Sequence, residues 1–229
     1  MKTIIFFCCI LFSSLMTVSA SAYVINLGLG NNDLNGYTGP FATVTVELEA
    51  SNIAHLTVTG AAYGPNNNYF MGDGALVALN VNATNFTAYQ FSAFTMPGFE
   101  APEFTEGGPG NVSEFGAFNF TLNNSDGWRY AAYQIELRLL NAGTWASPSD
   151  VLTSNNKGFM AASHIFVPNT TPATVAGGAA TTGYAGGAMP VPAPASILLL
   201  ASGLAGFAYR KARGKTASLG RRTNVTPLG

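Results

Sequence analysis

The 229-residue sequence predicts an all-β chain built on one antiparallel β-sandwich or jelly-roll-like domain. Apolar and polar residues alternate strictly in ATVTVELEA (42–50) and in IAHLTVTG (53–60), which is the period of a half-buried strand. Turn signals rich in Asn and Gly separate such segments. No long helical period interrupts them. Short strands spaced in this way are typical of antiparallel sandwiches.

The remaining elements of this domain follow the same logic. A short helix is expected at SPSDVL (147–152), where Ser147 suits the cap and Pro148 the first helical position. The 145 positions from 23 to 167 are enough for one domain with a sizeable core. Further strands are expected at residues 75–82, 85–94, 115–122, 133–140 and 158–167.

Residues 168–190 differ in composition from the domain that precedes them. Nineteen of these 23 positions are Gly, Ala, Thr or Pro. A segment of this kind buries too little apolar surface to offset the entropy lost on ordering. The composition therefore predicts a flexible linker.

The first 22 residues read as a secretory signal peptide. Lys2 precedes an apolar centre at 4–12, and small residues follow. Ala20 and Ala22 supply the pattern of a cleavage site, with cleavage expected after Ala22 and, as the alternative, after Ala20. Both cysteines lie in this segment, so the mature chain is expected to have neither a disulfide nor a thiolate metal site.

The charges divide the remaining chain into two parts. Residues 23–190 hold three basic and eleven acidic residues, a net charge of −8, which disfavours nucleic acid as a partner. Residues 195–209 carry no charge and would reach about 23 Å as a helix, against about 30 Å for a hydrocarbon core. A buried core helix is the alternative to a membrane span. Basic residues follow this run and favour a transmembrane helix whose C-terminal end stays in the cytoplasm. The first of them are Arg210, Lys211, Arg213 and Lys215, and a basic cytoplasmic tail is expected at 216–229.

The residues around this apolar run resemble a known sorting signal. Val191-Pro192-Ala193-Pro194, the apolar segment and the basic end are similar to the PEP-CTERM signal in its V-P-x-P variant, here spanning 191–215. The resemblance implies that Val191, Pro192 and Pro194 are read by exosortase, a membrane-embedded transpeptidase-like protease. It also implies an exported protein of a Gram-negative bacterium that makes exopolysaccharide. Signal peptidase and the general export machinery are then further partners. Such a chain would cross the inner membrane, be anchored transiently by its C-terminal helix, and end at the cell surface or outside the cell.

For each candidate catalytic or metal-binding residue in the sequence, a structural role is favoured over a functional one. His55 and His164 lie in predicted strands and are expected to be structural. NNDLNG (31–36) begins like a calcium loop, but Ala42 stands at the twelfth position, where a bidentate Glu is required, so a turn is favoured. Four glutamates in the loop at 100–114 are expected to be solvated. We therefore predict a protein that is not an enzyme and has no cofactor or metal.

Most aromatic residues fall in alternating strands and are assigned to the core. Trp128 and Tyr130, beside a turn, are the exceptions and form the candidate carbohydrate contact. The leading interpretation is a non-enzymatic surface or extracellular-matrix protein associated with exopolysaccharide. The alternative is a lectin-like carbohydrate-binding module delivered by the same route.

Overall fold

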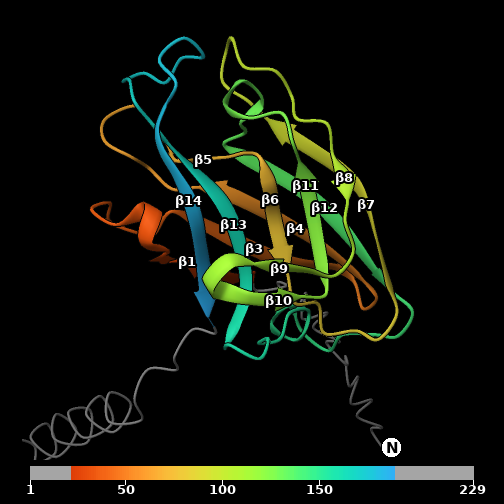
Figure 1. Cartoon of the computed structure of the whole chain (residues 1–229). Coiled ribbons are helices and arrows are strands. Elements are labelled where there is room, and N and C mark those ends of the chain that lie inside the picture. The colour runs from red at the N-terminus through yellow and green to blue at the C-terminus, as the bar shows by residue number, and fades with distance from the viewer. Residues whose placement is uncertain (1–21, 189–229) are drawn as a thin grey trace, which may run out of the picture. The chain divides into compact units, whose positions relative to one another are not determined.

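The computed structural model describes residues 22–188, which fold into antiparallel sheets (Figure 1). One sheet has five strands in the order β1-β3-β4-β12-β7. Alternation explains its two faces: Val44 and Val46 of β3 are buried, whereas Thr43 and Thr45 lie on the outer face. The strands are β1 (Tyr23–Leu27), β3 (Ala42–Ala50), β4 (Ile53–Gly60), β7 (Phe86–Phe94) and β12 (Gln134–Asn141).

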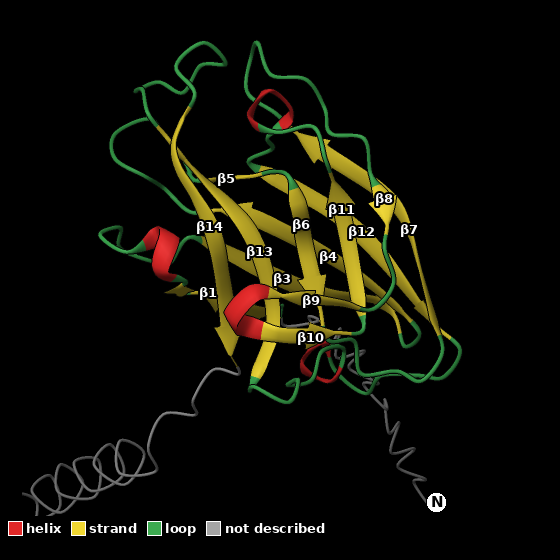
Figure 2. Ribbon diagram, in the orientation of Figure 1, coloured by secondary structure: helices red, strands yellow, loops and turns green. Residues whose placement is uncertain are grey.

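The second sheet follows the order β2-β14-β13-β6-β11-β8, with β5 also paired to β13. It packs face to face with the first (Figure 2), and one apolar core joins residues of both sheets. Its strands are β2 (Leu29–Gly30), β5 (Phe70–Met71), β6 (Gly74–Leu79), β8 (Thr105–Glu106), β11 (Phe120–Asn124), β13 (Phe159–Pro168) and β14 (Ala179–Ala188). A separate ribbon pairs β9 (Gly110–Val112) with β10 (Gly116–Phe118).

The prediction of an all-β antiparallel domain is confirmed. The segments 42–50 and 53–60 coincide with β3 and β4. The helix expected at 147–152 is a single 3₁₀ turn, η4 (Pro148–Asp150), with Pro148 at its start. The other three 3₁₀ turns are η1 (Asn32–Leu34), η2 (Ser113–Phe115) and η3 (Trp128–Tyr130). None of the helices among residues 22–188 is long and apolar enough to cross a membrane.

The prediction of a flexible linker at 168–190 is wrong for its described part. Residues 179–188 form β14, which lies between β2 and β13 in the second sheet. The register runs from Pro168 opposite Ala179 to Phe159 opposite Ala188. The turn between these strands is packed as well, since Ala173 is buried. The β domain, residues 22–188, therefore includes this segment.

β14 has few apolar side chains, but neighbouring elements pack closely against its glycines, and this explains its place in the core. A Cβ on Gly187 would lie 2.7 Å from the carbonyl oxygen of Asn26 in β1. A Cβ on Gly186 would enter the ring of Phe115. The glycines thus let β1 and η2 pack directly on the β14 backbone, and glycine inside a strand commonly marks such contact. Compositional reasoning cannot separate this use of glycine from flexibility.

The start of β1, the first strand of the β domain, lies close to the end of β14, its last strand. The hydroxyl of Tyr23, at the start of β1, lies 3.7 Å from the sulfur of Met160 in β13. Next to Met160, Phe159 pairs with Ala188, the last residue of β14. The two segments that carry the predicted signals, before Tyr23 and after Ala188, are thus joined to neighbouring points of the fold.

Candidate functional site

Most residues of the predicted sorting site lie outside the described range. These are Ala20, Val191, Pro192, Pro194, Arg210, Lys211, Arg213 and Lys215, together with the predicted transmembrane helix at 195–209. Ala22 is described: it is exposed and directly precedes β1. Cleavage after Ala22 stays a prediction.

Trp128 and Tyr130 both lie on η3, but they differ in what they contact. The indole of Trp128 is partly buried and packs edge-on against the rings of Phe70, Phe99 and Phe166, at centroid distances of 5.3, 5.0 and 5.7 Å. Its Nε1 donates a hydrogen bond of 3.0 Å to the carbonyl of Thr174. The indole therefore joins the β13–β14 turn to a small second core.

Tyr130 takes part in a surface group of polar side chains. Arg129 forms an ion pair with Glu100, and this hydrogen bond lowers the pKa of the Glu100 carboxyl. The same carboxyl accepts from Tyr130 and raises the pKa of its phenol. The structure thus brings Trp128 and Tyr130 onto one turn, with Trp128 facing the interior and Tyr130 engaged at the surface.

The turn at 31–36, considered for calcium, and two glutamates of the loop at 100–114 have polar partners within the fold. The amide of Asn31 donates to Asp33 at 2.9 Å and accepts from the backbone of Tyr184 at 3.1 Å. In the loop at 100–114, Glu100 pairs with Arg129, and Glu114 accepts from Asn32. Among residues 22–188, no three carboxylate or imidazole side chains converge as a metal site would need.

The two histidines are held by different elements. Nδ1 of His164 lies 2.7 Å from the carbonyl of Gly72 and 2.9 Å from that of Asp73, so Nδ1 carries the proton. Its ring stacks on Tyr184 of β14 at 4.6 Å, and burial raises the pKa of that phenol. His55, on the outer face of the first sheet, lies 3.6 Å from a carboxylate oxygen of Glu136. The histidines are on different sheets, and the structure does not bring them together.

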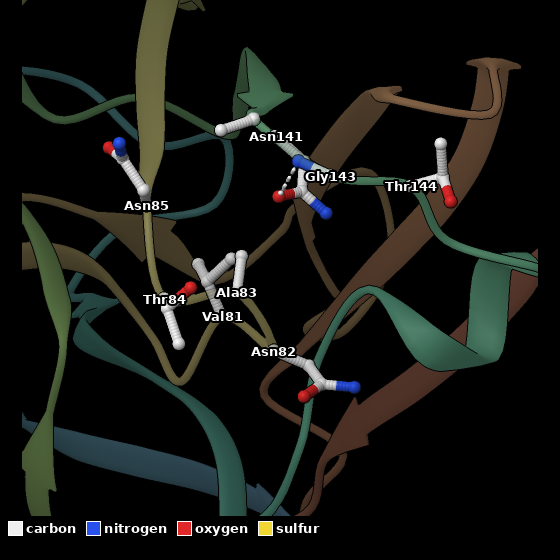
Figure 3. Close-up of a pocket in the computed structure, with 9 residues that line it drawn as sticks. Val81, Asn82, Ala83, Thr84, Asn85, Asn141, Gly143 and Thr144 are labelled. Carbon is white, nitrogen blue, oxygen red and sulfur yellow. Dashed lines mark hydrogen bonds between the residues drawn. The ribbon is translucent and has the colours of Figure 1, made fainter.

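The structure also shows a hollow that sequence reasoning missed (Figure 3). It has a volume of about 460 Å³ and lies between the loop Val81–Asn85 and the loop Asn141–Thr144. Val81 and Ala83 give it an apolar part, and the amide of Asn141 stands opposite them (Figure 3). In the sequence, the hollow is marked only by two loops rich in asparagine and threonine. Ordinary turns have the same composition, so the hollow could not be predicted from it.

Comparison with known proteins identifies the C-terminal segment. Residues 190–213 match the family model of the PEP-CTERM protein-sorting motif. No curated protein and no solved structure matches the chain. The matched residues include Val191, Pro192 and Pro194, and they begin two positions after β14 ends. The motif implies export and processing by exosortase. The chain therefore carries a PEP-CTERM protein-sorting motif, which follows an all-β domain in the sequence.

Proposed function

We propose that the chain is a non-enzymatic surface or extracellular-matrix protein that exosortase releases from the inner membrane after export. The match of residues 190–213 to the sorting motif carries this proposal. In it, residues 195–209 span the membrane and the cations from Arg210 onward keep the tail in the cytoplasm, because basic residues favour that side. The released protein is the β domain, which associates with exopolysaccharide outside the cell.

The sequence around the motif supports processing close to the end of the β domain. Proline fixes φ and disfavours helix at the residue before it, so in this proposal exosortase reads residues 191–194 as an extended peptide. An extended peptide offers its backbone to a protease. In the sequence only residues 189 and 190 separate the end of β14 from Val191, so cleavage within the motif would fall a few residues after this strand.

Replacing Val191, Pro192 and Pro194 together by alanine is expected to stop release of the protein into the medium. The altered chain should remain in the membrane fraction at full length, because the residues that exosortase reads are gone. Immunoblotting of medium and membranes from an exosortase-carrying host measures this. Deleting the exosortase should give the same distribution.

Pro65→Ala is a matched control, because this proline lies exposed in the β domain. The control should be released as the original chain is. Normal release of the triple alanine variant would contradict the proposal.

A second candidate function, the lectin-like module, is favoured by one observation. The uncharged hollow beside Asn141 offers amide and hydroxyl groups of the kind that pair with sugar hydroxyls. It is a different surface from Trp128 and Tyr130.

A further inference from the structure

The hollow between Val81–Asn85 and Asn141–Thr144 is formed by loops that the fold holds firmly. The backbone N–H of Ala142 donates to the carbonyl of Asn85 at 3.0 Å. Trp145, which is 4% exposed, donates from Nε1 to the carbonyl of Asn82 at 2.9 Å. Asn119 both donates to and accepts from the backbone of Val81, at 2.7 Å each. A site fixed in this way loses little conformational entropy when a ligand binds.

Asn141 is a buried polar side chain aimed into this hollow. It is 8% exposed. Its Oδ1 accepts a hydrogen bond of 2.9 Å from the backbone N–H of Gly143, which settles which end of the amide is oxygen. Nδ2 is therefore the other end of the amide (Figure 3), and it forms no hydrogen bond among the described residues. Nδ2 is not among the fully buried atoms without a partner in residues 22–188, so solvent reaches it, and it can donate to an acceptor on a ligand.

The lining selects the chemical class of that ligand. None of the side chains that line the hollow is charged, so neither an anion nor a cation gains a partner there. Amides and hydroxyls both donate and accept, as do the hydroxyls of a sugar. Val81 and Ala83 offer apolar contact to the C–H groups of a sugar ring. A volume of about 460 Å³ falls within the usual range for small-molecule sites. The polar groups at the rim belong to Asn82, Thr84, Asn85 and Thr144.

We propose that this hollow binds a neutral saccharide, with Nδ2 of Asn141 donating to one of its oxygens. The proposal rests on the proposed function only in that export brings the domain to a saccharide-rich exterior. A peptide is the less favoured ligand, because the hollow has no deep apolar pocket for a side chain and both loops have already used backbone groups on each other.

Titration of the purified full-length chain with short saccharides tests the proposal. The chain is kept in lauryldimethylamine oxide, a detergent without sugar groups, and heat is measured on adding maltotriose, cellotriose or mannotriose. At least one of them should bind with a dissociation constant of about a millimolar or below. Trigalacturonic acid, which is charged, should bind more weakly. The polymeric exopolysaccharide of the host should compete if the same sugar occurs within it.

Asn141→Asp isolates the donor, because it keeps the oxygen that Gly143 needs and removes the N–H group. It should weaken binding about tenfold, which is near the upper end of what one hydrogen bond contributes. Asn26→Asp, on the exposed edge strand β1, is the matched control and should bind as the original chain does. Melting curves verify that both variants fold. If Asn141→Asp does not fold, Thr144→Val provides the test instead.

Three results would overturn the proposal: unchanged affinity in a folded Asn141→Asp or Thr144→Val variant, no binding of any neutral trisaccharide, or binding of an unrelated neutral peptide in preference to all of them. Because the titration uses purified protein, its outcome is independent of whether cells release the chain. Failure of the saccharide site and failure of exosortase sorting are thus separate results.

Discussion

A chain that ends at residue 167 is expected to lose its folded state, whereas one that ends at residue 188 keeps it. The shorter chain lacks β14, which pairs along β13 and lies between β13 and β2. Its removal exposes the edge of β13 and uncovers Ile25 and Leu27, which pack against Gly187. The total stability of a domain is only about 5–15 kcal/mol, and losing an interior strand exceeds such a margin. Thermal unfolding followed by circular dichroism measures the difference.

A point substitution tests the same contact without truncation. Gly187→Ala places a methyl group against the backbone of Asn26 and should cost about 2–3 kcal/mol, the upper part of the usual range for overpacking. Gly28→Ala is the matched control, since its added methyl group would meet nothing within 4 Å. A chain ending at residue 167 that melts cooperatively at the same temperature as the longer one would show that β14 is dispensable.

Trp128→Ala is expected to lower the free energy of unfolding by about 3 kcal/mol, near the lower end for loss of a large aromatic side chain from a core. The substitution removes contacts with Phe70, Phe99 and Phe166 and the hydrogen bond to Thr174. Urea unfolding measures the change. Tyr130→Phe, on the same turn, should change the free energy far less, because only its exposed hydrogen bond to Glu100 is lost.

This expectation separates a structural role for Trp128 from a role as a sugar platform. A platform residue would lose saccharide affinity on substitution while the stability of the domain stayed the same. Unchanged urea unfolding of Trp128→Ala, together with weakened binding, would therefore contradict the packing role and restore the prediction made for Trp128 and Tyr130.

The strands that alternate were predictable because the signal is local. Val44, Val46 and their neighbours in β3 display the period of a half-buried strand without reference to any other segment. β14 was missed because its contribution depends on contact with distant elements. Its glycines are informative only once Asn26 and Phe115 are seen to lie against them.

The candidate sites show the same division. The sorting motif is contiguous, so it is recognisable from the sequence, and the family model matches the segment that contains Val191, Pro192 and Pro194. The hollow combines two loops about 60 positions apart, and the partner that orients Asn141 is a backbone N–H. The aromatic neighbours of Trp128 come from three different segments, which the sequence does not place together.

The intact mass of the protein secreted by its native host tests the central claim, release of a complete β domain by cleavage within the sorting motif. The account predicts a form that retains β14 through Ala188, ends between residues 189 and 195, and lacks the tail from Arg210 to Gly229. A secreted form that still ends at Gly229 would contradict sorting by exosortase. A form that ends before Ala179 would contradict the assignment of β14 to the released domain.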